Sequence, residues 1–380
     1  MILIEEYKDI KDITYDKNKL YNNSLNQFRL IVNLDSNHMF VFERRRRTEM
    51  EEIMKYLITG GAGFIGSHLS QELLKQGHSI ITIDNFNDYY DPKLKEKNYE
   101  LVQQTSKETG CFYMLYKGDV RDKNLVNQIF DEHQIDGVVA LAANAGVRPS
   151  IEDPLYYVDV NLIGLTNLLE AMRNHNCLSL AFVSSSSVYG NNKRVPFSEK
   201  DPVDNPISPY AATKKAGELL CYTYHSLFKM NIVCLRYFTV YGPRQRPDLA
   251  INKFTRLMLN DKPIPMFGNG TTARDYTYIS DIVEGTIKAL NYVIKKDKYI
   301  YDIFNLGGSH PISLKDLINI IAKAVGKEPI INQLPMQPGD VNITYSDYSH
   351  AKEILDYEPQ VRIEEGIKKF VDWYIGKLYE

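Results

Sequence analysis

The sequence lacks the features that mark several protein classes. It has only four cysteines in 380 residues, and none of them stands in a C-x-x-C pair or beside a histidine cluster, which argues against a zinc site or a disulfide framework. No stretch is apolar enough to span a bilayer, and the acidic start has no basic flank followed by an apolar run of signal-peptide length. These absences predict a cytoplasmic protein that binds no metal and no membrane.

The chain also lacks an excess of charge of either sign. Its 45 basic and 48 acidic residues give a formal net charge of −3. This balance gives no electrostatic reason to expect a nucleic acid or an anionic membrane as a partner. Hydrophobic residues, in contrast, make up 44% of the chain, which at this length predicts a large core and two cooperating domains.

The first part of the chain differs in composition from the rest. Residues 1–53 are rich in Asn, Asp, Lys and Tyr, and we interpret them as an appendage of unknown role. Residues 28–34 and 39–42 are expected to form a small hairpin. The arginine run at 44–47 fits a patch that binds nucleic acid or phosphate, but a solvated face or a disordered linker fits it better.

From residue 54 onward, short apolar runs alternate with amphipathic helical patterns. Such continuous runs are typical of strands that are buried on both faces, and the alternation predicts a Rossmann-type doubly wound parallel sheet in an α/β fold. Residues 54–240 are expected to form this domain. Residues 241–380, where prolines interrupt the regularity, are expected to form mainly a smaller α/β substrate-binding domain, with later segments able to return to the first. The expected strands are 56–58, 79–83, 112–115, 137–141, 180–183 and 232–235.

A glycine-rich turn follows the first expected strand. Gly60, Gly63 and Gly66 form a G-x-x-G-x-x-G pattern that opens an amphipathic helix, where free N–H groups and the positive end of the helix dipole suit a pyrophosphate. Asp84 ends the second strand, 18 residues after Gly66, and its carboxylate suits ribose hydroxyls but repels a 2′-phosphate. We therefore expect NAD rather than NADP. Asp119 either receives the adenine edge or caps the next helix.

The expected catalytic residues come from two segments. Ser208 and Pro209 have the pattern of a helix start, which places Tyr210 and Lys214 one turn apart on the same face. A Lys ammonium there, together with a positive nicotinamide ring, favours the phenolate and makes Tyr210 a general base. Ser185 belongs to a serine run at the end of an apolar strand, where polar side chains face the ligand crevice.

In combination these motifs resemble the extended short-chain dehydrogenase/reductase superfamily, specifically its nucleotide-sugar epimerases, over residues 54 to 380. Further segments that carry the resemblance are Ala142-Ala143, residues 236–243 and residues 274–281. The resemblance implies that Ser185 hydrogen-bonds the reacting hydroxyl and that Tyr210 accepts its proton. The chain departs from the pattern at Ala140, where relatives usually have His, and we expect that position to support packing.

Finer detail resembles UDP-glucuronate 4-epimerases. The segments concerned are NFNDYYDP at 85–92, AGVR at 145–148, GPRQRPD at 242–248 and QPGD at 337–340. The implied reaction converts UDP-glucuronate to UDP-galacturonate through a 4-keto sugar, with NAD bound and recycled. The product of such a reaction would naturally supply the synthesis of a capsule or surface polysaccharide. Thr239, with Ser186 or Ser187, is our hypothesis for the group that restrains the uronate carboxylate against decarboxylation.

The resemblance thus implies two sets of binding residues. Those for the cofactor are Gly60, Gly63, Phe64, Ile65, Gly66, Asp84, Asn85, Asp119, Val120, Leu141, Ala142, Ala143, Tyr210, Lys214 and Tyr237. Those for the UDP-sugar are Arg148, Ser185, Ser186, Ser187, Thr239, Arg246, Arg274 and Asp340.

Other functions of the same scaffold remain open. Sugar-nucleotide dehydratases and decarboxylases typically carry acidic residues where this chain has Ser186 and Ser187, so elimination would lack its acid–base pair. An epimerase of UDP-glucose or UDP-N-acetylglucosamine, a simple reductase and a dinucleotide-binding regulator are further alternatives. Apolar stripes on the expected helices 162–172 and 210–228 resemble surfaces through which relatives form homodimers, although packing on their own sheet also explains them.

Overall fold

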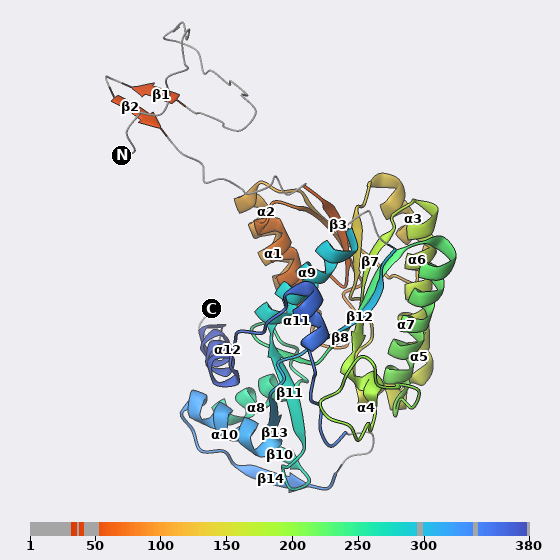
Figure 1. Ribbon diagram of the computed structural model, residues 1–380. Helices are drawn as coiled ribbons and strands as arrows, with labels where there is room; N and C mark the ends of the chain where they lie inside the picture. The colour runs from red at the N-terminus through yellow and green to blue at the C-terminus, as the bar shows by residue number, and fades with distance from the viewer. Residues whose placement is uncertain (1–31, 36–37, 42–52, 295–298, 337–340, 378–380) are drawn as a thin grey trace, which may run out of the picture. The chain divides into compact units, whose positions relative to one another are not determined.

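The computed structural model describes residues 32–35, 38–41, 53–294, 299–336 and 341–377 (Figure 1). The chain divides into two compact units, residues 1–52 and 53–380. In the first unit, strands β1 (Val32–Asp35) and β2 (His38–Val41) pair antiparallel, so a hairpin forms within the segments expected from the sequence. The rest of that expected hairpin and the arginine run at 44–47 lie outside the described residues.

The second unit is built on a seven-stranded parallel sheet. Its strand order is β12-β8-β7-β6-β3-β4-β5. The chain adds β4 and β5 on one side of β3 and then crosses to add β6 on the other side, which creates a switch point between β3 and β6. The expected doubly wound sheet is confirmed, and β12 from the later part of the chain adds a seventh strand. The strands are β3 (Lys55–Thr59), β4 (Ser79–Asp84), β5 (Tyr113–Lys117), β6 (Gly137–Ala140), β7 (Ser179–Ser185), β8 (Asn231–Tyr237) and β12 (Tyr301–Leu306).

Helices cover both faces of this sheet (Figure 1). One core contains apolar side chains of α1 (Phe64–Lys75) and α9 (Ile279–Ile294), and α2 (Pro92–Thr109) packs against α1. The other core contains side chains of the helices on the opposite face, and the central strands β3, β6, β7 and β8 contribute side chains to both. These opposite helices are α3 (Lys123–Glu132), α6 (Gly164–Asn174) and α7 (Pro209–Phe228).

The helix expected from residue 162 does not start as a regular α-helix. Residues Asp159–Ile163 form a π-helical turn, η1, and α6 continues from it. The wider turn holds the side chain of Asn161, where it donates hydrogen bonds to the carbonyl of Asn144 at 3.1 Å and to Oγ1 of Thr213 at 3.0 Å. A hydrophobic periodicity does not reveal such a turn, because the apolar positions of α6 itself keep their 3.6-residue spacing.

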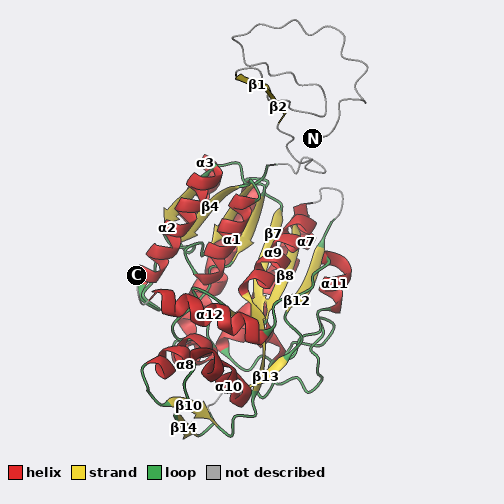
Figure 2. Cartoon of the chain, turned by 90° about the vertical axis from the view of Figure 1, so that its left-hand side faces the viewer, coloured by secondary structure: helices red, strands yellow, loops and turns green. Residues whose placement is uncertain are grey.

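The remaining elements include α8, α10, β10 and β14, which gather at one end of the unit (Figure 2). A three-stranded sheet has the order β13-β11-β9, and β10 pairs parallel with β14. None of the described helices is long and apolar enough to cross a membrane. The elements are α4 (Val147–Glu152), α5 (Pro154–Val158), η2 (Ser186–Tyr189), β9 (Thr239–Tyr241), α8 (Ala250–Leu259), β10 (Ile264–Phe267), β11 (Ala273–Tyr278), β13 (Pro311–Ser313), α10 (Leu314–Val325), β14 (Ile331–Leu334), α11 (Ser349–Leu355) and α12 (Ile363–Lys377).

Candidate active site

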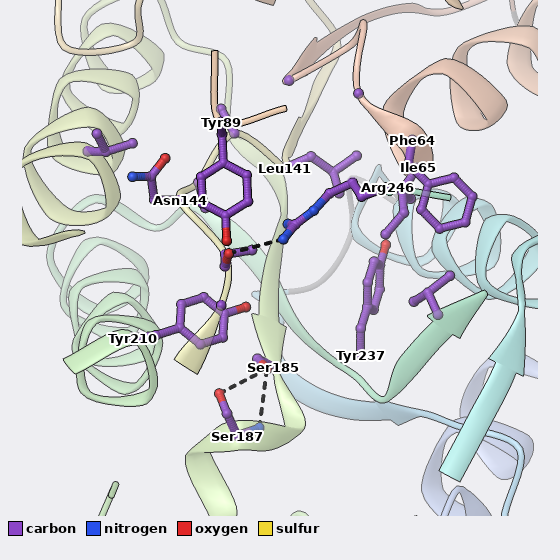
Figure 3. Close-up of a pocket in the computed structure, with 18 of the residues that line it drawn as sticks. Phe64, Ile65, Tyr89, Leu141, Asn144, Ser185, Ser187, Tyr210, Tyr237 and Arg246 are labelled. Carbon is purple, nitrogen blue, oxygen red and sulfur yellow. Dashed lines mark hydrogen bonds between the residues drawn. The ribbon is translucent and has the colours of Figure 1, made fainter. Parts of the chain in front are cut away.

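A cavity of about 510 Å³ lies along the carboxyl ends of the parallel strands (Figure 3). Ligands of open α/β sheets bind at this edge, next to the switch point. Most residues singled out from the sequence line it together. They are Gly60, Gly63, Phe64, Ile65, Gly66, Asp84, Asn85, Asp119, Val120, Leu141, Ala142, Ala143, Ser185, Ser186, Ser187, Tyr210, Tyr237, Thr239, Arg246 and Arg274.

The glycine turn leaves the start of α1 open to the cavity. Gly60 has φ +73°, and a Cβ atom there would lie 3.1 Å from the backbone nitrogen of Ala142. A Cβ on Gly66 would collide with the carbonyl oxygen of Gly60. Gly63 is the N-cap of α1 and offers no side chain to the free N–H groups of the first turn. The turn is therefore a cradle that fits a dinucleotide pyrophosphate, since its anion meets N–H donors and a positive dipole end.

Asp84 is held at the end of β4 by backbone donors. Its carboxylate accepts hydrogen bonds from the N–H of Ala62 at 3.1 Å and of Phe86 at 2.9 Å. Nζ of Lys95, on α2, lies 3.5 Å from Asp84 Oδ1, and both side chains are buried. Lys95 was not expected at the site, because a lysine on an amphipathic helix gives no sign that it turns inward. The expected preference for NAD over NADP rests on the negative charge of Asp84, and Lys95 partly balances this charge.

Asp119 does not cap the following helix, because Asp122 is the N-cap of α3. Its carboxylate instead binds the guanidinium of Arg121 and accepts a 2.8 Å hydrogen bond from Asn85 Nδ2. These contacts lower the pKa of Asp119. Asp119 therefore lines the cavity as a fixed carboxylate beside the end of β5.

Tyr210 lies in the first turn of α7, whose start agrees with the sequence pattern. Oγ of Ser208 accepts a hydrogen bond from the N–H of Ala211 at 3.1 Å, and Pro209 occupies the first helical position. The Tyr210 ring projects toward Ser185 in Figure 3. Burial raises the pKa of Tyr210, whereas a hydrogen bond with Ser185 and the positive charge of Arg246 lower it. The pKa of Tyr210 is therefore raised overall, and its phenol lies beside the Ser185 hydroxyl at the wall of the cavity.

Lys214 lies one turn further along α7 and is buried. Its Nζ donates a 2.7 Å hydrogen bond to the carbonyl of Val183, and burial lowers the pKa of Lys214 to about 8. Lys214 is not among the residues that line the cavity, and the cation that lowers the pKa of Tyr210 here is Arg246. This differs from the expectation that Lys214, together with the nicotinamide ring, lowers that pKa.

The serine run turns from strand into a short helix. Ser185 ends β7, and its Oγ accepts hydrogen bonds from the N–H and the hydroxyl of Ser187, the latter at 2.9 Å. Ser186 and Ser187 start η2 and line the cavity. Ser184 points the other way and donates to Glu218 at 2.7 Å inside the core.

Arg246 and Tyr89 form the opposite wall of the site (Figure 3). The guanidinium carbon of Arg246 lies 4.7 Å from the centroid of the Tyr89 ring, and its Nη2 is 2.7 Å from Asp248 Oδ2. Tyr157 contacts the edge of the Tyr210 ring with centroids 6.2 Å apart. Neither Tyr89 nor Tyr157 could be assigned to the site from the sequence, because an aromatic residue in a loop or a short helix carries no spacing signal.

Besides Lys214, two of the expected residues, Arg148 and Asp340, stand apart from this arrangement or outside it. Arg148 is not among the residues that line the cavity, and its guanidinium carbon lies 4.8 Å from the Phe267 ring centroid. Asp340 lies outside the described residues. Arg274 lines the cavity and donates from Nη1 to the carbonyl of Ala273 at 2.9 Å. Within the described part of the chain, no group of three or more His, Cys, Asp or Glu side chains is arranged to hold a metal ion.

Comparison with known protein families shows which family this chain belongs to. The family model described as GDP-mannose 4,6 dehydratase matches residues 57–370. The chain belongs to this family of extended short-chain dehydrogenase/reductases. The assignment confirms the resemblance seen in the sequence, and the family's Rossmann fold agrees with the observed sheet.

Among its relatives in this family, a UDP-glucuronate 4-epimerase from Thermodesulfobacterium geofontis is 44% identical over 319 residues, which are 84% of this chain and 95% of the relative. The crystal structure of a UDP-glucuronic acid 4-epimerase from Bacillus cereus, in complex with UDP-glucuronic acid and NAD, is similar with 39% identity and a TM-score of 0.77, covering 86% of this chain and 100% of that one. A UDP-glucose 4-epimerase from Thermotoga maritima, with UDP-glucose, is 31% identical with a TM-score of 0.76 and covers 86% and 100%.

Proposed function

We propose that this chain is an NAD-dependent UDP-sugar 4-epimerase whose substrate pair is UDP-glucuronate and UDP-galacturonate. The observation that carries the proposal is that the hydroxyls of Ser186, Ser187 and Thr239 and the cation of Arg246 line the same cavity as Ser185 and Tyr210, which we take as its sugar side. The similar proteins named for this reaction support it. Hydroxyl and guanidinium donors suit a substrate that carries a carboxylate beside the reacting carbon.

The scarcity of carboxylates among the described residues of the cavity wall is evidence against an elimination reaction. Among the described residues that line the cavity, the only carboxylates are Asp84 and Asp119, and both lie at strand ends beside the glycine turn, on the cofactor side. A dehydratase needs an acid and a base that reach C5 and C6 of the sugar. The two serines that follow Ser185 offer neither group at neutral pH. Epimerisation needs only proton transfer at O4, which Tyr210 supplies.

Tyr210 and Ser185 carry the proton transfer. In the forward step the C4–H bond breaks as a hydride leaves, the O4 proton passes to the Tyr210 phenolate, and a C4=O double bond forms. When bound, NAD supplies the acceptor for this hydride and, once reduced, returns it to the other face of C4. Tyr210 then gives its proton back to O4. Ser185 hydrogen-bonds the oxygen throughout, so no net oxidation takes place.

Thr239 and the two serines act on the carboxylate. With glucuronate the 4-keto sugar is a β-keto acid, which loses carbon dioxide when its C5–C6 bond aligns with the carbonyl π system. Thr239 starts β9, which pairs with β11 at Tyr276, so its backbone is fixed on the sugar side of the cavity. Donors that hold the carboxylate in another rotamer suppress decarboxylation by geometry.

Arg274 and Asp340 are proposed to hold the nucleoside diphosphate. Arg274 enters the cavity from β11 and is hydrogen-bonded through Nη1 to its own strand, which limits the movement of the guanidinium. Planar guanidinium groups bind phosphate oxygens with two parallel hydrogen bonds, so its position suits the diphosphate. Arg148 remains a proposed substrate-binding residue, although its guanidinium packs on Phe267 in this structure.

We further propose that two copies associate through α5, η1 and α7. The apolar stripe of α6 is buried in its own core, so that helix does not supply the surface. Large apolar side chains nevertheless remain exposed on its neighbours, among them Leu155 at 80% and Leu227 at 65%. Apolar side chains that gather on one surface mark an interaction site, and we propose that these side chains form the contact between two copies. The others are Val158, Ile163, Leu219 and Tyr222.

We also propose that the protein is located in the cytoplasm. All four cysteines are free thiols, and three of them are buried. Proteins that keep free thiols are typical of reducing compartments. The location is checked by fractionating cells that express the chain and probing each fraction with an antibody.

The test is to incubate the purified protein with UDP-glucuronate, without added cofactor, and to follow the sugar protons by NMR. Growth of UDP-galacturonate signals supports a 4-epimerase that carries its own NAD. UDP-xylose or a keto-pentose would instead identify a decarboxylase. No change with UDP-glucuronate, but turnover of UDP-glucose or UDP-N-acetylglucosamine, would leave an epimerase of another sugar. The matched control is Tyr210→Phe, which keeps the fold and removes the proton acceptor.

A further inference from the structure

A second cavity, of about 400 Å³, is lined by residues of α2, the segment 244–247, α8 and the end of α12. The three helices are labelled in Figure 2. Four cationic side chains line it, one from each of these parts of the chain, and no carboxylate is among the described residues of its wall. The only tryptophan of the chain, Trp373, also lines it. The cations are Lys97, Arg244, Arg256 and Lys377.

Arg244 brings a positive charge for which no ion pair is found among the described residues. Its guanidinium contacts the imidazole of His68, with Nε 3.0 Å from His68 Nε2, and its Nη1 is buried without a hydrogen-bond partner among the described residues. Burial and the charge of Arg244 lower the pKa of His68 to about 3, so this imidazole is neutral. A buried guanidinium beside a neutral partner keeps its positive charge, and an anion in the adjacent cavity would compensate it.

The exposed cations would make the direct contacts. Arg256 and Lys97 are exposed on α8 and α2, and Nζ of Lys377 lies 5.3 Å from the centroid of the Trp373 ring. Lys377 is half-buried, and its pKa is lowered by burial and by the charge of Lys97. Guanidinium and ammonium groups converging on one cavity suit phosphate oxygens. The flat side chain of Trp373 suits an organic group attached to the phosphate.

The walls of this cavity are bonded to the active site. Asn98 donates from Nδ2 to the carbonyl of Ala62 in the glycine turn at 3.0 Å. Gln245 donates from Nε2 to the carbonyl of Val240 at 3.1 Å, one residue after Thr239. Arg244 has φ +68°, a left-handed backbone in a residue with a side chain, and it lies two residues before Arg246. A ligand that moved this segment would therefore move a residue of the sugar site.

We propose that this second cavity binds a phosphate-bearing anion, and that its occupancy changes the affinity of the active site through the segment 242–248. The binding site uses none of the residues assigned to the reaction. Its test reads binding rather than turnover and so stands apart from the epimerase proposal.

The experiment uses the full chain loaded with NAD and saturated with UDP, which fills the phosphate site of the larger cavity. Equilibrium dialysis with radiolabelled pyrophosphate then counts any further site. We expect one saturable site per chain, accompanied by a change in Trp373 fluorescence, because the only indole lies in its wall. Arg256→Gln and Lys377→Gln should each weaken binding about tenfold. Lys368→Gln, on the same helix but outside the cavity, is the matched control and should leave it unchanged.

Absence of a saturable pyrophosphate site, or equal binding by Arg256→Gln and the starting protein, would overturn the proposal. The coupling is measured separately, as the dissociation constant of UDP with and without pyrophosphate. A change of twofold or more that disappears in Arg256→Gln supports it. A change that persists in this variant is competition in the active site and contradicts the coupling.

Discussion

Arg236 and Glu218 form a bidentate ion pair inside the core, with Nε–Oε1 and Nη2–Oε2 both at 2.9 Å and each side chain 1% exposed. Glu218 also accepts a hydrogen bond from Ser184, and Nη1 of Arg236 donates to the Tyr189 hydroxyl at 3.0 Å. The pair thus joins β8, α7 and both ends of the turn that follows β7. It fixes the serine turn against the helix that carries Tyr210.

Replacing Glu218 by Gln should destabilise the protein by about 3–5 kcal/mol, because it leaves the buried Arg236 guanidinium without its counter-charge. Urea unfolding followed by circular dichroism measures the change. Glu284→Gln breaks a surface pair with Lys288 and should cost less than about 1 kcal/mol. Equal costs for the two variants would contradict a special role for the buried pair.

Tyr210→Phe should lower kcat by about 10²–10⁴-fold, because it removes the group that takes the O4 proton while the ring keeps its packing. NAD content, measured from the cofactor released on denaturation, should stay the same. Tyr299→Phe removes a hydroxyl from a tyrosine that is 73% exposed and should change neither quantity. A Tyr210→Phe variant with an ordinary rate would show that another group accepts the proton.

Thr239→Val should let part of the 4-keto sugar decarboxylate, because the carboxylate loses a donor that fixes its rotamer. Chromatography of the products should then show a UDP-pentose besides UDP-galacturonate, together with a weaker preference for the uronate. Thr223→Val, on the exposed side of α7, is the control. If Thr239→Val makes no pentose and keeps its preference, the restraint lies elsewhere.

The rate should fall as the pH rises through about 8. Burial lowers the pKa of Lys214 to about 8, so its ammonium is present below that pH and is lost above it. In this structure the cation that lowers the pKa of Tyr210 is Arg246. We propose that the Lys214 ammonium, one helical turn away, adds to the support of the phenolate once NAD is bound, so that loss of its charge weakens this support. Initial rates between pH 6 and 10 measure the profile, and Lys214→Arg should remove its alkaline fall, because a guanidinium stays charged. A flat profile up to pH 10 in the unaltered protein would refute the assignment.

Folding stability should decrease in mild acid because of His68. Its folded-state pKa of about 3 lies below the usual 6.5, so the unfolded chain binds the proton first, and stability is lost as the pH falls from about 6.5 toward 3. One such group predicts a loss of about 2 kcal/mol between pH 7 and pH 5. Urea midpoints at the two pH values measure it. His68→Asn should reduce this dependence, whereas His310→Asn, at an exposed position, should keep it.

The sheet and the cofactor turn could be predicted because their signals are local. The strands from β3 to β8 and the glycine turn appear in the sequence as unbroken apolar runs and as a fixed glycine spacing. The structure reproduces these at Lys55–Thr59, for example, and at Gly60 to Gly66. Ser208 likewise showed where α7 begins, because an N-cap is chosen by its immediate neighbours.

The contacts that complete the site could not be predicted in this way. Lys95 reaches Asp84 from a separate helix, and Tyr89 stacks on Arg246 across 157 residues of sequence. Asn161 turns inward only because a π-helical turn displaces it. Each of these pairings depends on how elements that are distant in sequence pack together. The local sequence around one residue of a pair therefore does not predict the other residue.

The placement of the whole site at one edge of the sheet has an evolutionary consequence. The residues that bury the sheet lie along its strands and helices, whereas Ser186, Ser187 and Thr239 lie in the segments that follow two strand ends. These three residues line the cavity and belong to none of the apolar clusters, so a substitution there should alter the cavity wall with little loss of buried apolar contact. If the proposed function holds, a single substitution there should change the sugar preference without an intermediate form that is less stable.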